Sequence, residues 1–151
     1  MQEALFGAGC FWGIEEYFRK IHGVNDTKVG YSGGYTKNPT YEIVCVGTTE
    51  HVEVLQIDFN ENEISYEKLL DHFWICHDPT SLNKQGPDIG RQYRSAIFYF
   101  SDIQKEIAEN SIIKHQPKFN NKIVTEITTA DTFYLAKDYH QLFIQKRKET
   151  A

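Results

Sequence analysis

The chain has 151 residues, of which 40% are hydrophobic, and a formal net charge of −5. This length suits one domain with a proper core, and the acidic balance argues against a basic nucleic-acid-binding surface. No apolar run approaches a membrane span, and the acidic start does not resemble a secretory signal. Three cysteines without a CxxC pair are typical of a reducing compartment. We therefore expect a cytoplasmic, monomeric protein with a single domain over residues 1–151 and no membrane or nucleic-acid partner.

The first cysteine stands where a short apolar strand gives way to a helix. Residues 4–8 predict the strand, and apolar side chains recurring at helical spacing predict a helix over residues 14–21. Cys10 therefore falls at a helix N-terminus, where unpaired backbone N–H groups and the helix dipole favour a thiolate. Phe11 and Trp12 are placed to wall a small apolar pocket. The alternative is a structural cysteine in a hydrophobic turn, although the flanking glycines favour a functional thiol.

Further strands are predicted before residue 60. Val24 to Tyr31 predicts one, and residues 41–46 are apolar and β-branched up to Gly47. Residues 51–59 alternate almost perfectly between two faces.

This alternation gives Glu53 an unusual position. It places Glu53 on the more apolar face of the strand, together with Leu55, Ile57 and Phe59. A carboxyl group on that face would be partly desolvated, which raises its pKa. The alternative, which the pattern leaves open, is a wet strand end where Glu53 reaches solvent.

A helix and a long polar loop follow. Ser65 can cap a helix over residues 66–75, and His77-Asp78 is expected to organise the loop that begins at Pro79. Residues 80–94 form a loop long enough to suggest that it builds a functional site.

The rest of the chain predicts a strand over 94–100, a helix over 102–115, a strand over 123–129 and a helix over 136–148. Asp102 is expected to cap the first of these helices, with isoleucines facing inward: Ile103, Ile107 and Ile112 or Ile113. The element order β-α-β-β-α-β followed by α-β-α predicts an α+β fold in which helices pack on a mixed sheet.

The candidate chemistry is a nucleophilic thiol assisted by an acid. Cys10 would attack an electrophile, Glu53 would transfer a proton, and Tyr41, Asp88 and Tyr93 would supply polar groups. Spacing alone does not bring these residues together.

Two other chemistries remain open at this point. A Cys–His pair with His51 or His140 would make a thiol hydrolase. His72 and Cys76 have the helical spacing of metal ligands, but a closed zinc site needs further strong ligands from elsewhere, so we predict no metal. A binding module with a structural Cys10 is the non-enzymatic alternative.

The motif Gly9-Cys10-Phe11-Trp12-Gly13 resembles the signature of the peptide methionine sulfoxide reductase A family. Other segments follow the pattern of that family in order, over nearly the whole chain: Gly30-Tyr31-Ser32-Gly33-Gly34, Asn38-Pro39-Thr40-Tyr41, Val44-Cys45, Gly47-Thr48-Thr49-Glu50-His51-Val52-Glu53, His77-Asp78-Pro79, Gln92-Tyr93-Arg94-Ser95-Ala96-Ile97 and Asp138-Tyr139-His140-Gln141.

The resemblance implies a two-layer α/β roll, or ferredoxin-like α/β plait, that reduces the S epimer of methionine sulfoxide, free or in proteins, for protein repair and antioxidant defence. It implies that the Cys10 thiolate attacks the sulfoxide sulfur and is left as a sulfenic acid. Catalytic and substrate-binding roles are implied for five further residues besides Tyr41: Glu53, Asp88, Tyr93, Phe11 and Trp12.

The chain departs from many family members in its tail, which carries no cysteine after Cys76. The intramolecular disulfide usual in the family therefore cannot form from the tail. Cys76 is a possible resolving thiol, and Cys45, in an apolar run, is expected to be buried and inert. The default expectation is that an outside thiol, from thioredoxin or from glutathione with glutaredoxin, attacks the Cys10 sulfenic acid, with no bound cofactor.

Overall fold

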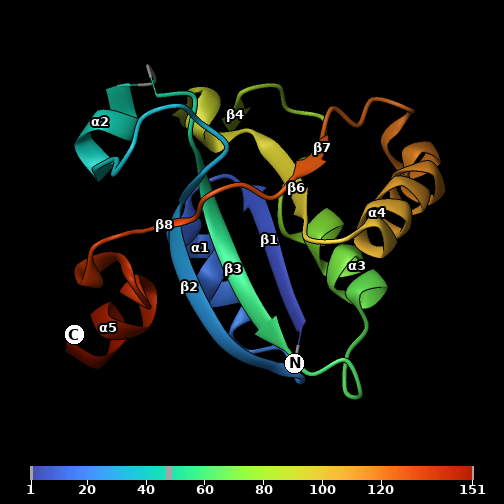
Figure 1. The fold of residues 1–151 in the computed structure, drawn as a ribbon, viewed down its shortest axis with the longest axis horizontal. Coiled ribbons are helices and arrows are strands. Elements are labelled where there is room, and N and C mark those ends of the chain that lie inside the picture. The colour runs from blue at the N-terminus through green and yellow to red at the C-terminus, as the bar shows by residue number, and fades with distance from the viewer. Residues whose placement is uncertain (1, 47–48, 151) are drawn as a thin grey trace.

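A six-stranded mixed sheet forms the centre of the fold (Figure 1). The computed structural model describes residues 2–46 and 49–150, so the family motif positions Gly47 and Thr48 lie outside the described residues. The strands, in their order across the sheet, are β7 (Glu126–Thr129), β6 (Ser95–Tyr99), β1 (Gln2–Ala8), β3 (Val52–Phe59), β2 (Val24–Ser32) and β8 (Tyr134–Leu135). Neighbours are antiparallel except β6 and β7, which are parallel. The predicted mixed sheet is therefore confirmed.

The helices predicted over residues 66–75 and 102–115 are confirmed, whereas the first helix begins earlier than predicted and residues 41–46 form a helix that was not predicted. The helices are α1 (Phe11–Phe18), α2 (Tyr41–Val46), α3 (Tyr66–Cys76), α4 (Asp102–His115) and α5 (Phe143–Thr150), with 3-10 turns at Arg91–Tyr93, Gln116–Phe119 and Asp138–His140. The long loop also contains a small hairpin of β4 (Lys84–Gln85) and β5 (Asp88–Ile89). Among the described residues, no helix has the length and apolar character needed to cross a membrane.

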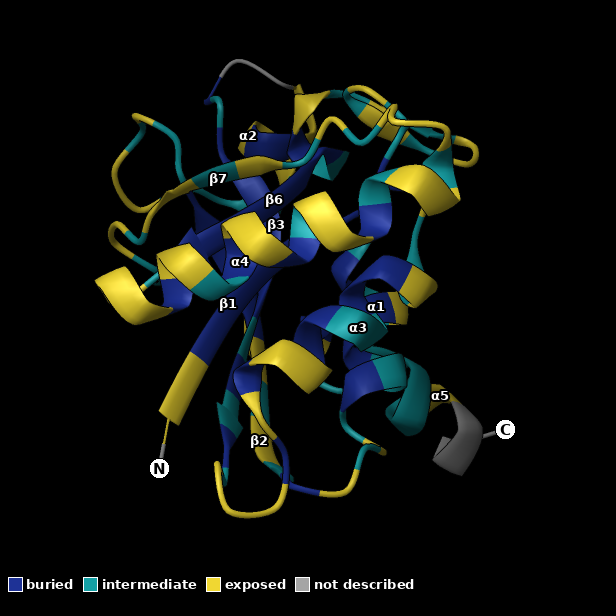
Figure 2. Ribbon diagram, turned by 90° about the vertical axis from the view of Figure 1, so that its right-hand side faces the viewer, coloured by how far each residue is buried: buried dark blue, intermediate teal, exposed yellow. Residues whose placement is uncertain are grey.

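The core lies mainly between the sheet and the helices α1 and α3. Leu55, Ile57 and Phe59 of β3 are buried in this larger cluster, whereas Val52 and Val54 face a smaller one on the opposite side. The segment joining β7 to β8 crosses that opposite side in Figure 1, and its Phe133 packs there. Figure 2 shows central strands that are almost wholly buried and helices with exposed outer faces. The two faces predicted from the alternation of β3 are confirmed.

Helix α4 differs from its prediction because its inner face is polar. Ser101 caps it instead of Asp102, with its Oγ accepting the Gln104 N–H at 3.2 Å. Ile103 is 71% exposed, whereas Gln104 is buried, and its side chain donates to the Glu3 carbonyl at 2.8 Å. Ile113 is also exposed, whereas Ile107 and Ile112 are both partly buried and pack against the core. Buried polar groups that are hydrogen-bonded escape a search for apolar periodicity.

The C-terminal segment docks along the free edge of β2, and this positions part of the site. The predicted helix over 136–148 begins only at Phe143, because the residues before it bind along the edge of β2. Gln141 uses its side chain in place of a strand, accepting the Val29 N–H at 2.8 Å and donating to the Val29 carbonyl at 2.9 Å. Glu15 of α1 then accepts the Leu142 N–H at 2.6 Å. These contacts hold the Asp138–His140 turn beside α1.

Candidate active site

The predicted position of Cys10 at a helix N-terminus is confirmed. Cys10 is the N-cap of α1, and its carbonyl accepts the Ile14 N–H at 3.4 Å. Gly9 has φ +93°, and a Cβ there would come within 2.9 Å of the Gln85 side chain. Only glycine combines this backbone conformation with such close approach. The loop that carries Gln85 therefore packs directly against the start of α1.

The ionisation of Cys10 differs from the prediction. Partial burial raises the pKa of this thiol to about 11, and the charges of Glu53 and Asp88 raise it further. The N–H groups of Trp12 and Gly13 lower it, as expected for a helix N-terminus, but their effect is smaller than that of desolvation. In the free protein Cys10 is therefore a thiol at neutral pH, and the favoured thiolate predicted from the sequence is wrong.

Of the two environments that the sequence left open for Glu53, the structure has the desolvated one. Glu53 is 1% exposed and lies opposite Tyr31 in the pairing of β3 with β2. Its Oε1 accepts the Phe11 N–H at 3.2 Å, while its Oε2 is buried and has no hydrogen-bond partner among the described residues. Burial raises its pKa to about 8, the Phe11 N–H lowers it, and the charge of Asp88 raises it. The Phe11 N–H lies in the first turn of α1, so it links the carboxyl group to the helix that begins at Cys10.

The other three predicted polar residues gather around this pair from separate elements. Tyr41 begins α2, Asp88 lies in β5, and Tyr93 ends a 3-10 turn. Burial raises the pKa of Tyr93, and the charges of Glu53, Asp88 and Cys10 raise it too. Burial likewise raises the pKa of Tyr41, with contributions from Cys45, Glu53 and Tyr93. Both phenols therefore stay protonated at neutral pH and can donate hydrogen bonds.

An aromatic wall borders the start of α1, formed by Phe11, Trp12, Tyr41, His140 and Phe143. The Trp12 indole stacks on the Phe143 ring with centroids 4.0 Å apart and donates to His140 Nδ1 at 3.0 Å. The Tyr41 ring centroid lies 4.7 Å from that of His140 and 6.4 Å from that of Phe11. The sequence predicted Phe11 and Trp12 in this role but missed Phe143. Its place depends on the docking of the C-terminal segment, which leaves no local signal.

Cys45 is the site neighbour that the sequence placed wrongly. It is exposed, not buried, and its carbonyl accepts from Gln92 Nε2 at 3.4 Å. The error came from treating residues 41–46 as an apolar stretch. In a helix, Tyr41 and Cys45 are four residues apart and share a face.

The histidines of the predicted Cys–His alternative are engaged elsewhere. His51 bonds the backbone of the preceding loop through both ring nitrogens, accepting from the Gly34 N–H at 3.0 Å and contacting the Thr36 carbonyl at 2.7 Å. His140 accepts from the Trp12 indole, and burial lowers its pKa, so it is neutral. These contacts favour structural roles for both rings.

The residues with metal-ligand spacing also have other partners. His72 bonds the Tyr17 hydroxyl at 2.9 Å, and His77 bonds Ser95 Oγ at 2.7 Å. Asp78 accepts from both the N–H and the hydroxyl of Thr80, so its predicted role in organising the loop is confirmed. No group of three or more potential ligands occurs among the described residues.

Cys76 ends α3 in a more enclosed place. Its thiol donates to the Phe73 carbonyl at 3.3 Å and lies 4.0 Å from His77 Nδ1. Burial raises its pKa to about 12. The charge of Cys76 acts on Tyr17, which is not one of the site residues above.

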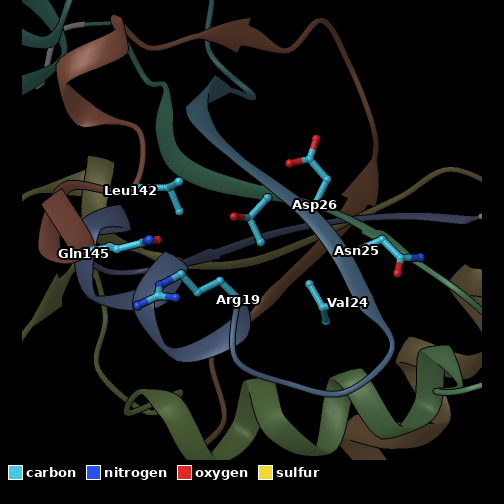
Figure 3. Close-up of a pocket in the computed structure, with 7 residues that line it drawn as sticks. Arg19, Val24, Asn25, Asp26, Leu142 and Gln145 are labelled. Carbon is cyan, nitrogen blue, oxygen red and sulfur yellow. The ribbon is translucent and has the colours of Figure 1, made fainter. Parts of the chain in front are cut away.

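A pocket elsewhere is lined by residues from the end of α1, the start of β2 and the C-terminal segment (Figure 3). They are Arg19, Val24, Asn25, Asp26, Thr27, Leu142 and Gln145. None of the predicted site residues lines it, so the candidate chemistry belongs to the group around Cys10.

Comparison with known proteins agrees with this assignment. A family profile described as peptide methionine sulfoxide reductase matches residues 2–151. The chain is similar to peptide methionine sulfoxide reductase MsrA of Methanothermobacter thermautotrophicus, with 52% identity over 147 residues that cover 96% of this chain and 87% of that protein. Its fold is similar to the crystal structure of Mxr1 from Saccharomyces cerevisiae in reduced form, with a TM-score of 0.94 and 39% identity over 98% of this chain and 86% of that one.

The fold is also similar to Mxr1 from the same yeast in complex with Trx2, with a TM-score of 0.67 and 29% identity over 94% of this chain and 84% of that one. The profile match over nearly the whole length, with a relative above half identity, shows that the chain belongs to the peptide methionine sulfoxide reductase family.

Proposed function

We propose that this chain reduces methionine (S)-S-oxide, free or in proteins, to methionine, with Cys10 as the nucleophile and Glu53 as the acid. The observation that carries the proposal is the unpartnered Oε2 of Glu53, buried near Cys10 in a carboxyl group with a pKa of about 8. At neutral pH this group is mostly protonated and can donate to a sulfoxide oxygen. The biological role is repair of oxidised proteins and antioxidant defence.

The reaction is a two-electron exchange between two sulfurs. The Cys10 sulfur attacks the sulfoxide sulfur while Glu53 gives a proton to the sulfoxide oxygen. The attack forms a bond between the two sulfurs, and the Cys10 thiol proton goes to the Glu53 carboxylate. The hydroxyl group then passes from the substrate sulfur to the Cys10 sulfur, the substrate S–O bond and the bond between the two sulfurs break, and methionine leaves. One thiol and one sulfoxide thus become one sulfenic acid and one thioether.

The neutral resting state fits an uncharged substrate. With pKa values of about 11 and about 8, Cys10 and Glu53 are both mostly protonated at neutral pH. A sulfoxide is a neutral dipole, so it enters the partly buried site without leaving a charge unpaired. Its oxygen becomes more basic as the sulfur is attacked, and Glu53, Tyr41 and Tyr93 then supply hydrogen bonds where charge develops. Asp88 holds the polar side of the site.

Selectivity between the two epimers of the sulfoxide follows from the fixed directions of the three groups on its sulfur. The oxygen points to Glu53, the methyl group packs on Phe11 and Trp12, and the remaining arm extends outward. Only one epimer at sulfur satisfies all three, and membership of the peptide methionine sulfoxide reductase family supports the S epimer as the proposed substrate.

The remaining features are proposed on the same basis. One catalytic domain spans residues 1–151, and the order β6-β1-β3-β2 supports a ferredoxin-like plait at its centre. The protein works as a monomer in the cytoplasm, binds no cofactor, and takes electrons from thioredoxin or from glutathione with glutaredoxin. The complex of yeast Mxr1 with Trx2 supports thioredoxin.

A simple assay tests the proposal. The protein is mixed with racemic methionine sulfoxide and dithiothreitol, and methionine is measured. Conversion should stop near half, and Cys10→Ser should form none. If the wild-type protein formed no methionine, the proposed activity would be contradicted. Full conversion of the racemic sulfoxide would contradict the selectivity for one epimer.

A further inference from the structure

We propose that Arg94 is a positioning residue of this enzyme, which holds Tyr93 beside Glu53 through the 3-10 turn at Arg91–Tyr93. The inference rests on the proposed function, in which Tyr93 and Glu53 both donate to the sulfoxide oxygen. Arg94 follows Tyr93 directly in the chain and is only 6% exposed. It is therefore a buried cation next to one of the phenols that the reaction uses.

The guanidinium group of Arg94 is hydrogen-bonded through all three of its nitrogens. Its Nη1 donates to the Arg91 carbonyl at 2.9 Å, and its Nη2 donates to the Glu50 carbonyl at 3.0 Å. Its Nε donates to Glu126 Oε2 at 3.2 Å. A buried charge is costly unless it is paired and hydrogen-bonded, and these bonds meet both conditions. The side chain thereby joins the 3-10 turn, the segment before β3 and the edge strand β7.

The first of these bonds closes the turn that carries Tyr93. The Arg91 carbonyl accepts twice from Arg94, once from Nη1 and once from the backbone N–H at 3.2 Å. The Tyr93 N–H donates to the Gly90 carbonyl at 3.1 Å. A 3-10 turn this short has few bonds of its own, and their geometry is poorer than in an α-helix. The second donor from Arg94 therefore helps to fix the direction in which the Tyr93 side chain leaves the backbone.

The second bond fixes the backbone that leads to Glu53. Glu50 stands three residues before Glu53 and has φ +63°, a conformation that side chains other than glycine adopt only at a cost. Its carbonyl is held by Arg94 and its carboxylate by the Arg91 side chain. The 3-10 turn also lies against β3. Arg94 thus connects the two backbone segments that carry the proposed donors, and this sets the spacing between them.

Only an arginine can make this set of bonds. Its planar guanidinium group carries five N–H donors in a fixed fork, whereas a lysine concentrates three donors on one nitrogen. Arg94→Lys therefore keeps the positive charge but cannot reach both carbonyls and the Glu126 carboxylate in the same way. The substitution removes the positioning and leaves the charge, which makes it the informative variant.

A double-mutant cycle tests the inference. The single-turnover rate of methionine formation is measured at pH 7 for the wild type, Arg94→Lys, Tyr93→Phe and the double variant, each shown to be folded by circular dichroism. Arg94→Lys should lower the wild-type rate about fivefold, because a misplaced donor stabilises the developing charge less well. In the Tyr93→Phe background it should change the rate by less than about 1.5-fold, because the hydroxyl that it positions is absent.

Two further variants complete the design. Arg91→Lys is the matched control, because Arg91 also bonds Glu50 but at a half-exposed position, so the rate should stay within about 1.5-fold. Glu126→Ala removes the carboxylate partner of Arg94 at another half-exposed position, and it keeps the inference testable if Arg94→Lys does not fold. It should lower the rate about threefold, again only while Tyr93 is present.

The pH profile gives a second readout. The wild-type rate should fall as the pH rises through about 8, where Glu53 loses its proton. Arg94→Lys should keep this inflection, because the substitution displaces the phenol and leaves the carboxyl group buried. An inflection that moves toward pH 4.5 would show that Arg94 keeps Glu53 out of water, and it would overturn the assignment to Tyr93.

The remaining outcomes separate this inference from the proposed function. Equal losses from Arg94→Lys with and without the Tyr93 hydroxyl would show that Arg94 only stabilises the fold. A folded Arg94→Lys variant with the wild-type rate would also overturn the inference, and in both cases the reductase activity would stand. A wild-type protein that forms no methionine would contradict the proposed function itself.

Discussion

At the residue scale, Cys10 and Glu53 resist ionisation for the same reason. Each is removed from water; Cys10 also feels the negative charges of Glu53 and Asp88, and Glu53 feels that of Asp88. Two backbone N–H groups favour the Cys10 thiolate, and one favours the Glu53 carboxylate, yet desolvation exceeds both effects. The site therefore holds two protons at neutral pH, of which the Glu53 proton goes to the substrate as charge develops and the Cys10 proton replaces it on Glu53.

Glu53→Gln should slow methionine formation about 100-fold at pH 7, because the amide cannot transfer a proton. In the wild type, the single-turnover rate should fall as the pH rises through about 8, where Glu53 loses its proton. The variant should lack that inflection. Stopped-flow measurement from pH 6 to 10 checks this, with Glu67→Gln on the exposed face of α3 as the control.

A wild-type rate that rises through pH 8 would contradict this order of proton transfers. It would show that the Glu53 carboxylate first removes the Cys10 proton.

The hydroxyls of Tyr41 and Tyr93 should each contribute to the first turnover. Removing one donor to a developing oxyanion costs about 1.4 kcal/mol, so Tyr41→Phe and Tyr93→Phe should each lower kcat/KM about tenfold. Tyr139→Phe, at a half-exposed ring next to His140, is the matched control. Equal rates for all three variants and the wild type would remove the phenols from the mechanism.

At the element scale, Gln141 is the side chain that makes most hydrogen bonds in the docking of the C-terminal segment on β2, beside the backbone bond from the Ala136 N–H to the Val29 carbonyl. Gln141 makes three hydrogen bonds, two with Val29 and one with the Ala136 carbonyl at 3.0 Å. These bonds continue the sheet where no strand is present. They also hold His140 against Trp12.

Gln141→Ala should lower the free energy of unfolding by about 2 kcal/mol, because the Val29 N–H loses its bond to the side chain and the Val29 carbonyl keeps only the Ala136 N–H. It should also weaken substrate binding through the loosened aromatic wall. Urea unfolding followed by Trp fluorescence measures the first effect, with Gln2→Ala at an exposed strand start as the control. A change within error of that control would show that water replaces the side chain without cost.

Sequence reasoning succeeded where one local pattern determines the structure. The alternation of β3 placed Glu53 on the more apolar face, although it left a solvated strand end open, and the junction of β1 and α1 placed Cys10 at a helix N-terminus. It failed for α2, whose six residues are too few for a helical period and whose first turn is held by Thr40 accepting the Ile43 N–H at 3.3 Å. It failed for residues 136–142 because their conformation is set by contacts with distant elements. The bond from the Gln92 side chain to the Cys45 carbonyl is a tertiary contact of the same kind.

At the scale of the whole molecule, the buried carboxyl group of Glu53 makes stability depend on pH. Folding raises its pKa from 4.5 to about 8, so the folded state binds more protons than the unfolded state between these values. The stabilisation that the protonated Glu53 carboxyl group gives to the folded state is therefore fully present below pH 4.5 and is lost as the pH rises through about 8.

Glu53→Gln should consequently be more stable than the wild type at pH 9 by roughly 3–5 kcal/mol, and the difference should shrink toward pH 5. Urea unfolding at both pH values gives the comparison. A difference that does not change between them would mean that Glu53 is solvated in the folded protein.

The short edges of the sheet affect whether an oxidised, partly unfolded protein aggregates on this one. The outermost strands, β7 and β8, have four and two residues. Long exposed strand edges recruit unfolded polypeptides into intermolecular β-structure, which leads to aggregation. Edges as short as these offer few backbone groups for that pairing. An oxidised, partly unfolded client can therefore present a side chain to the site and depart without being nucleated into an aggregate on the enzyme that repairs it.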